Sequence, residues 1–249
     1  MSEITEHDVI AAITSQGGIA RLLGGRAVHA VCGESLPAIL RRTSLDIDLV
    51  TNGRSRKALR AAMTELGCTP EHEFNLLNGK ERMIFHAGDT KIDIFIDMFR
   101  MCHTLNLTHR LELHPLTLSP ADLLLTKLQI VYAEQKDLSD IAALLLACGL
   151  GSEQLGAIDT GYIAKLLGND WGFWRTCSGT LKTLDARADD ICHDHDLSLS
   201  LRRHINELLT VLETAPRGLS WRMRALIGER SPWYELPEEP VTGHLPTTA

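Results

Sequence analysis

The sequence predicts an α+β protein in which a mixed sheet flanked by helices is followed by a helical C-terminal domain. Strand-like runs with period-two alternation fall in residues 1–118, whereas apolar positions at helical spacing dominate residues 119–235. A composition of 44% hydrophobic and 23% charged residues is typical of a globular protein with a sizeable core. We therefore expect an α/β domain over 1–118, a helical domain over 119–235 that closes a cleft, and a loosely ordered, proline-rich tail over 236–249.

The first domain opens with helical patterns. Apolar residues at helical spacing over 7–24 predict one or two short helices that end at Gly24-Gly25. The stretch 26–33 can continue as a helix. "LDIDLVT" at 45–51 then alternates with period two, which predicts a strand.

Local signals also delimit the elements that follow. Residues 55–68 have a serine start, strong helix formers and a glycine stop, and they predict a helix. The strand-like runs 81–88 and 90–99 are separated by a Gly-Asp turn signal, so they predict a hairpin. The helical domain begins where Ser119 can cap a helix and Pro120 suits its first turn.

The cysteine and charge patterns favour a cytoplasmic protein. Six cysteines are scattered without any CxxC pair, which suits reduced thiols better than a disulfide framework or a zinc site. No apolar run reaches the roughly 18 to 20 residues that cross a bilayer, and the N-terminus is acidic and polar, so we expect no membrane partner. A net charge of −7 argues against nucleic-acid binding driven by bulk charge, although "RSRKALR" at 54–60 is a local basic patch.

Two of the predicted strands carry acidic side chains at alternate positions. On the first, Asp46 and Asp48 point to one face, roughly 6 to 7 Å apart, while Ile47 points to the other. On the second, Asp93 and Asp97 share a face in the same way. Two carboxylates so close repel each other unless a cation lies between them, and hard oxygen ligands suit Mg²⁺ or Mn²⁺.

A single acidic pair of this kind is most often a solvent-facing strand edge. The second acidic strand and the Gly-Gly turn in "LLGGRAVHA" at 22–30 favour a functional site instead. A third carboxylate, from Asp93 or Asp97, would complete a site for two metal ions about 3.5 to 4 Å apart, which can stabilise both oxygens of a phosphoryl displacement. Glycines before a helix let backbone N–H groups approach phosphate oxygens, and the helix N-terminus favours negative charge.

These stretches, together with "ADLLLTKLQIVYAEQKDLSDIAALL" at 121–145, resemble the polymerase-β-like nucleotidyltransferase superfamily. Within it, the chain is most similar to bacterial toxin-type members, the AbiEii-like nucleotidyltransferases of abortive-infection toxin–antitoxin systems. The resemblance covers residues 20–148 and implies a nucleotidyltransferase-like mixed sheet.

The resemblance implies roles for individual residues. Gly24 and Gly25 would hold nucleotide phosphates. Asp46 and Asp48 would bind the metal, and Asp93 would complete the catalytic and metal-binding site as the third acid. Asp97 is the alternative for that last role.

Four further residues extend this pattern. Arg26 replaces the usual serine or threonine after the glycines, which removes a hydroxyl from the phosphate turn but offers a cation. Lys127 matches a lysine of the toxin-type branch and is expected to neutralise triphosphate charge. Asp137 and Asp140 match as well, and the alternative for them is a solvated helix face on which Lys136 pairs with Asp140.

The function that the resemblance implies is transfer of an NMP from an NTP to an acceptor hydroxyl, with release of pyrophosphate and with Mg²⁺ or Mn²⁺ as cofactor. Candidate acceptors are a tRNA end, a protein hydroxyl and a small molecule, and an antitoxin protein is an implied partner. The alternative is a noncatalytic nucleotide-binding or partner-binding module of the same fold. An RNA acceptor would need a basic channel, for which the candidates are Arg41, Arg42, Arg54, Arg56, Lys57 and Arg60.

Overall fold

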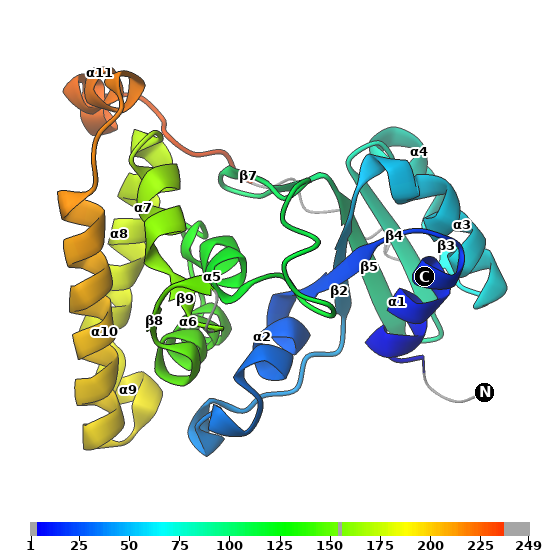
Figure 1. Cartoon of the computed structure of the whole chain (residues 1–249), viewed down its shortest axis with the longest axis horizontal. Helices are drawn as coiled ribbons and strands as arrows, with labels where there is room; N and C mark the ends of the chain where they lie inside the picture. Colours follow the sequence, from blue (N-terminus) through cyan, green and yellow to red (C-terminus); the bar gives the residue numbers. More distant parts are fainter. Residues whose placement is uncertain (1–3, 154–155, 237–249) are drawn as a thin grey trace, which may run out of the picture.

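The computed structural model describes residues 4–153 and 156–236 and confirms the α+β class, with a mixed sheet on one side and helices on the other (Figure 1). The first part contains α1 (Glu6–Ser15), β1 (Ala20–Leu23), α2 (Gly24–Cys32), β2 (Ile47–Thr51), α3 (Arg56–Glu65), β3 (Thr69–Pro70), α4 (His72–Asn78), β4 (Arg82–Ala87), β5 (Thr90–Ile96), β6 (Met98–Arg100) and β7 (Thr104–Asn106). The helical part contains α5 (Pro120–Leu128), α6 (Gln135–Cys148), β8 (Leu150–Gly151), β9 (Ile158–Asp159), α7 (Thr160–Leu167), α8 (Trp171–Ala186), α9 (Ala188–Cys192), α10 (His195–Thr214) and α11 (Leu219–Ile227). None of the described helices combines the length and the apolar character that crossing a bilayer requires. Of the predicted tail, residues 237–249 lie outside the described residues.

Five strands form the mixed sheet, in the order β1-β2-β5-β4-β3. β2 and β5 run parallel, while the other neighbouring pairs are antiparallel. β4 and β5 are the predicted hairpin, and its two-residue turn aligns Ala87 with Thr90. The β2–β5 register places Asp48 opposite Asp93, so the two acidic strands are neighbours.

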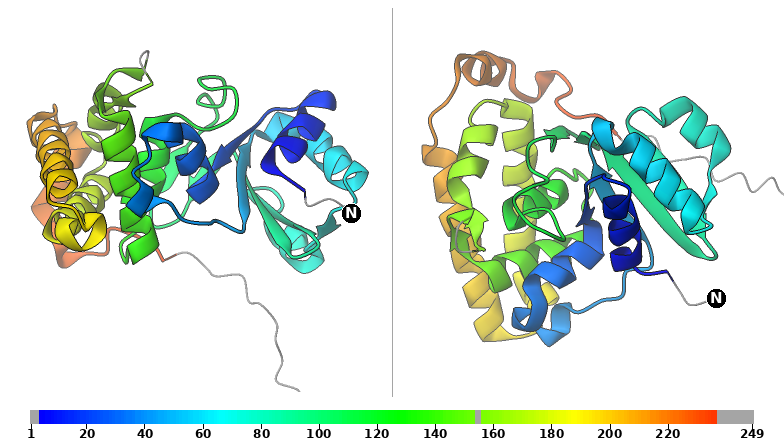
Figure 2. Two further views of the ribbon diagram at one scale, coloured as in Figure 1. Left: turned by 90° about the horizontal axis from the view of Figure 1, so that it is seen from below. Right: turned by 45° about the vertical axis from the view of Figure 1, so that its right-hand side comes forward.

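One face of the sheet is apolar and the other carries the acids. Ile47, Leu49 and Ile94 are fully buried, and their face is the one on which α1 and α3 lie (Figure 2). Because side chains alternate along a strand, Asp48 and Asp93 point to the opposite face, toward α2 and α5. The alternation predicted for these strands therefore separates core from candidate site.

The predicted helical segment before Gly24 is wrong in part. α1 ends at Ser15, and Gly17 takes a positive φ of 79°, which stops the helix. Residues Ala20–Leu23 instead form the edge strand β1, paired antiparallel with β2. Pairing with a neighbouring strand overrides the helical spacing of this short apolar run.

The two further helices predicted for the first part are confirmed, while the predicted strand over 90–99 is divided at Asp97 into β5 and β6. The helices predicted at 26–33 and 55–68 correspond to α2 and α3. The strand predicted over 45–51 begins only at Ile47, because Asp46 lies in a bend.

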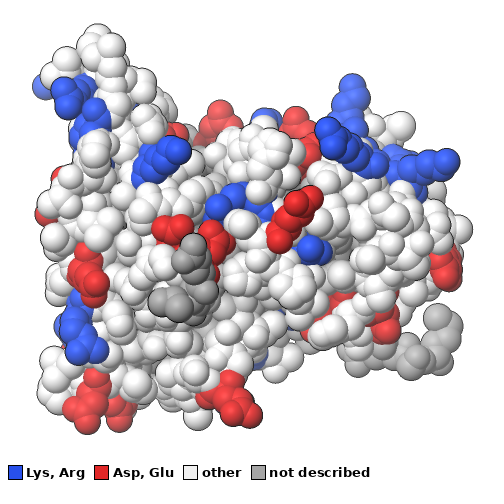
Figure 3. All heavy atoms as spheres, in the orientation of Figure 1, with Lys and Arg blue, Asp and Glu red and all other residues white. Residues whose placement is uncertain are grey.

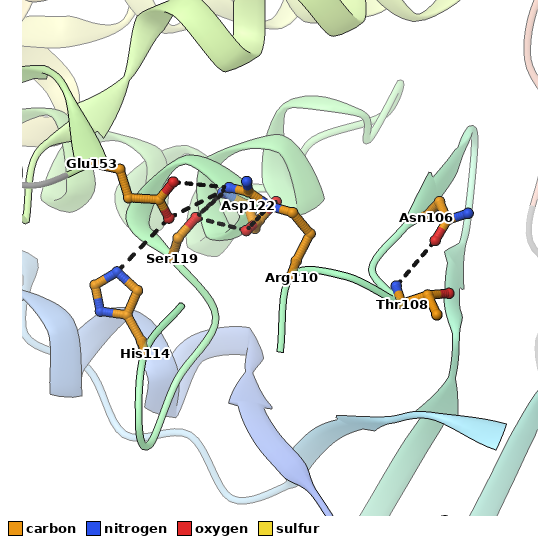
Figure 4. A network of polar contacts seen from close by, with 7 residues as sticks. All are labelled: Asn106, Thr108, Arg110, His114, Ser119, Asp122 and Glu153. Carbon is orange, nitrogen blue, oxygen red and sulfur yellow. Dashed lines mark hydrogen bonds and ion pairs between the residues drawn. The ribbon is translucent and has the colours of Figure 1, made fainter. Parts of the chain in front are cut away.

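A half-buried arginine, Arg110, connects the loop between the two parts to the helical part (Figure 4). Arg110 donates to Asp122 at 2.9 Å and to Ser119 at 3.2 Å. Its guanidinium also lies 3.8 Å from the ring centroid of Tyr162 and 3.5 Å from Glu153. Burial raises the pKa of Asp122, and the Arg110 charge opposes that shift.

The two parts share further contacts. α2 packs against both α5 and α6. The Leu22 N–H donates to the Leu116 carbonyl at 2.9 Å, and the Leu118 N–H donates to the Leu22 carbonyl at 3.0 Å. The connecting loop thus pairs with β1, and the domain boundary at 118 and 119 stays a prediction.

The last described residues return from the helical part to the first part (Figure 1). The Glu235 N–H donates to the Cys102 carbonyl at 3.1 Å. The Trp233 indole N–H donates to the Thr176 hydroxyl at 3.2 Å. This segment bridges the region between β7 and α8.

Candidate active site

The N-terminus of α2 lies directly against the acidic face of the sheet. Gly24 has a positive φ of 73°, and a Cβ atom there would collide with the Asp48 carboxylate. A Cβ atom at Gly25 would collide with the Arg42 guanidinium. Among the described residues, no side chain caps the first turn of α2, so the positive end of the helix dipole lies beside an acid. Glycine is what allows this close approach.

The structure places two of the three predicted acids, Asp48 and Asp93, side by side, and Asp46 just before them in the chain. Asp48 and Asp93 are register partners on parallel strands, whose backbones lie about 4.8 Å apart. Asp46 lies in the bend just before β2 and is exposed. Burial raises the pKa of Asp48 to about 6, and the negative charges of Asp93 and Asp46 add to the shift, while Lys127 and Lys91 oppose it. The cluster therefore carries more negative charge than its surroundings balance.

The negative charge of Asp93 is balanced by two cationic side chains of the protein, Arg82 and Lys91. The Asp93 side chain is buried, and Arg82 donates to both carboxylate oxygens, at 2.8 and 2.6 Å. Lys91 lies 3.0 Å from one of the same oxygens. The Arg82 guanidinium lies 4.7 Å from the ring centroid of Phe95 and 5.6 Å from that of Phe74, so aromatic rings hold it in place.

Asp97 does not join the acids. β5 ends at Ile96, and Asp97 takes a left-handed φ of 64°. Its carboxylate accepts from the Gly53 N–H at 3.0 Å, and its own N–H donates to the Thr51 carbonyl at 2.8 Å. The expectation that Asp97 continues the face of Asp93 is wrong, because the chain turns before reaching it.

A second charged cluster is formed by Lys127 of α5, Arg42, and Asp137 and Asp140 of α6. The Lys127 ammonium is 2.9 Å from Asp140 and 3.1 Å from Asp137. Arg42 grips Asp140 through two bonds of 2.8 and 2.6 Å. Burial would lower the pKa of Lys127, but the two carboxylates raise it overall. The solvated helix face weighed for Asp137 and Asp140 is wrong, because both are buried and Lys136 pairs elsewhere.

Arg26 holds the loop that leads into β2. Its guanidinium donates to the carbonyls of Ser44 at 3.0 Å and Leu45 at 2.7 Å. It also pairs with Glu6 of α1 at 2.8 Å. These bonds position the segment that carries Asp46, and the phosphate contact expected of Arg26 stays a prediction.

The candidate residues of a basic channel lie in separate places. Arg41 and Arg42 line a pocket of about 320 Å³ beside His29 of α2. Arg56 and Arg60 line another cavity, on α3. Because α3 covers the apolar face of the sheet, these cations do not form one continuous channel (Figure 2).

The acids that remain available fit a divalent cation. Across the described ranges 4–153 and 156–236, no preassembled group of three His, Cys, Asp or Glu side chains surrounds one point. Asp93 is engaged by arginine and lysine, which leaves Asp46 and Asp48 as hard oxygen donors. Mg²⁺ typically binds through one or two carboxylates, waters and substrate phosphates. Burial, followed by the negative charge of Asp93, raises the pKa of Asp48, and a bound cation would oppose both effects.

Two cations at Asp93 were absent from the sequence interpretation, although the hairpin contained the signal. A two-residue turn that pairs Ala87 with Thr90 also pairs Ile84 with Asp93. Arg82 then lies one diagonal step from Asp93 on the same face, within reach of a long side chain. Lys91 shares that face at position i−2.

Comparisons with known proteins give limited similarity. No protein-family model matches the chain, and no curated protein matches it. Two solved structures share part of its arrangement: a solution structure of the antibiotic-resistance factor ANT(2'')-Ia and a crystal structure of ANT(2'')-Ia in complex with adenylyl-2''-tobramycin. They are 15% and 16% identical to this chain, and each match covers 64% of it and 90% or 95% of the other chain, with a TM-score of 0.42. A function therefore has to be inferred from this chain's own residues.

We expect Asp48→Asn to stabilise the metal-free protein above pH 6 and to change its stability little below pH 4. A folded-state pKa raised to about 6 means that the native state holds the proton more tightly than the unfolded state, so the wild type loses stability as the pH rises from about 4 to about 6. The loss reaches at most about 3 kcal/mol. Urea unfolding with EDTA from pH 4 to pH 8 measures it. Asp89→Asn, in the exposed hairpin turn, is the control. If Asp48→Asn showed the same pH dependence of stability as the wild type, the raised pKa of Asp48 would be contradicted.

Arg26→Gln is expected to lower the free energy of unfolding by about 1 to 2 kcal/mol, because the carbonyls of Ser44 and Leu45 lose their charged donor. Glu6→Gln removes only the ion pair and should cost less than about 1 kcal/mol. Thermal and urea unfolding compare the two variants. A loss of nucleotide affinity in Arg26→Gln alone, at a temperature where both are folded, is what the predicted phosphate contact requires.

Proposed function

We propose that this protein is a metal-dependent nucleotidyltransferase that moves an NMP from an NTP to an acceptor hydroxyl and releases pyrophosphate. The observation that carries the proposal is the β2–β5 register, which sets Asp48 beside Asp93 under the uncapped N-terminus of α2. An acidic pair and a helix N-terminus in contact are what a metal-bound phosphate chain needs.

The carboxylates of Asp46 and Asp48 would hold Mg²⁺ or Mn²⁺. When bound, that ion would neutralise triphosphate charge and polarise the phosphate under attack. The backbone N–H groups at Gly24 and Gly25 would hold phosphate oxygens, because no side chain of the described residues caps the first turn of α2. Lys127, buried and charged, adds a positive charge near Asp48.

Asp93 would accept the proton of the acceptor hydroxyl. The hydroxyl oxygen then attacks the α-phosphorus, the bond to the β-phosphate oxygen breaks, and pyrophosphate leaves. Arg82 and Lys91 hold the Asp93 carboxylate in one orientation, and the proton transfer would require one of these cations to release an oxygen. Asp140 would influence the site through its ion pairs with Lys127 and Arg42. The Arg42 guanidinium in turn lies against Gly25.

The acceptor is proposed to be a small molecule or a protein hydroxyl rather than a tRNA end. The cations beside the acids all form ion pairs with carboxylates: Arg42, Arg82, Lys91 and Lys127. A polyanionic acceptor would therefore meet few free positive charges at the site. Membership of the AbiEii-like branch, an antitoxin partner and a cytoplasmic location remain proposals from the sequence resemblance.

One observation favours the noncatalytic alternative, a module that binds nucleotide or a partner without transfer. Asp93, the acid that the mechanism needs free, already accepts two bonds from Arg82 and an ion pair from Lys91. A module of this kind would show a Mg²⁺-dependent thermal shift with an NTP but no pyrophosphate release. Pyrophosphate release in the presence of an acceptor separates the two functions.

Asp93→Asn is expected to lower nucleotide transfer by about 100-fold or more, because a general base contributes roughly that much. Asp97→Asn should leave transfer within about threefold of wild type, since Asp97 supports only the turn near Gly53. The assay follows labelled NTPs, with Mg²⁺ and a cell extract, into acceptors. Asp48→Asn provides a second inactive variant, and thermal unfolding checks that each variant is folded. Equal transfer by Asp93→Asn and Asp97→Asn would contradict the role of Asp93.

A further inference from the structure

A second cavity lies on the side of the sheet opposite the acids, between α3 and α4. It encloses about 550 Å³, within the usual range of small-molecule sites. Met83 and Phe85 of β4 form its floor, and Met83 is the register partner of Ile94 on the apolar face. Nothing in the proposed transfer reaction uses this cavity.

Positive charge gathers at this cavity. Figure 3 shows Lys and Arg side chains collected at the corner where Figure 1 places α3 and α4. The five cations there are Arg54, Arg56, Lys57, Arg60 and Lys80, of which Arg56, Arg60 and Lys80 line the cavity. Within residues 4–153 and 156–236, none of the five forms an ion pair. In a chain of net charge −7, such a group attracts an anion.

Arg56 has an unsatisfied donor at this cavity. Its Nε atom is buried and finds no hydrogen-bond partner among the described residues. One terminal nitrogen donates to the Lys80 carbonyl, which holds the guanidinium between α3 and the end of α4. Buried N–H groups are nearly always bonded, and a small movement of the Arg56 side chain would present this donor to an anionic oxygen in the cavity.

Apolar side chains form the floor and part of the wall of the cavity, beside the polar residues Thr64, His72 and Asn75. Met83 and Phe85 are 1% and 6% exposed, whereas Leu76 on the α4 wall is 86% exposed. A ligand with an apolar or planar body would cover Leu76 and contact the floor, and it would gain free energy from the apolar surface removed from water. The cavity thus pairs a cationic end with an apolar body site.

We propose that the cavity between α3 and α4 binds a small organic phosphate. The phosphate group lies at Arg56, Arg60 and Lys80. The body of the ligand lies over Met83 and Phe85. An alkyl-chain phosphate and a nucleoside monophosphate share this chemistry. The site is separate from the carboxylates, so it does not depend on the proposed transfer reaction.

The test is isothermal titration of the full chain with octyl phosphate, AMP and inorganic phosphate. We expect at least one of the two esters to bind at least tenfold more tightly than inorganic phosphate, and the tighter ester identifies the kind of body. The double variant Arg60→Gln/Lys80→Gln should weaken that ester tenfold or more. The matched control Arg54→Gln/Lys57→Gln removes the same two charges outside the cavity and should change the affinity less than threefold. All four side chains are exposed, and thermal unfolding verifies folding.

Two further measurements sharpen the result. Leu76→Ser should weaken the ester while leaving inorganic phosphate unchanged, because only the body of the ester contacts this side chain. AMP bound among the carboxylates instead would respond to Asp48→Asn and not to the cavity variants. That response, failure of both esters to bind, or equal losses in the two double variants would overturn the proposal.

Discussion

The parallel pairing of β2 with β5 is the contact on which the rest of the candidate site depends. It sets Asp48 beside Asp93 on a largely buried face, where each negative charge makes the other less favourable. Two kinds of interaction offset this repulsion between the carboxylates. Cationic side chains approach Asp93, and the backbone of α2 approaches Asp48 through Gly24.

The charges of the acids are compensated unevenly. Asp93 receives Arg82 and Lys91, so its charge is balanced inside the protein. Lys127 is shared with Asp137 and Asp140, and only part of its field reaches Asp48. A buried ion pair is weak evidence for stability but strong evidence for positioning when its geometry is bidentate. The least compensated acids, Asp46 and Asp48, are those a cation from solvent can reach.

Alternation and turn chemistry predict much of this arrangement from the sequence. Period two along 45–51 separates Asp48 from the aliphatic core, and a two-residue turn aligns β4 with β5. Both signals are local, which is why they can be seen without the fold. The acids, the glycine pair and the helix after Ser119 follow from the same kind of local reasoning.

The features that the sequence did not predict depend on contacts between residues far apart in the chain. β1 forms a strand only because β2 lies beside it. Asp97 leaves the predicted face because its side chain is drawn to the Gly53 N–H across the β2–α3 turn. Arg42 pairs with an acid 98 residues away, a contact that no spacing rule contains. Buried ion pairs are therefore the part of this site that requires coordinates.

The last described segment, which returns to the first part, limits how far the two parts can move apart. The bonds from Glu235 to Cys102 and from Trp233 to Thr176 make the last described segment a strap across both parts. Arg110 fastens the connecting loop at another point. A helical part held at two places can tilt against the sheet only within the slack of these bonds. Wide separation of the two parts would break these bonds, whereas small side-chain and loop movements would not.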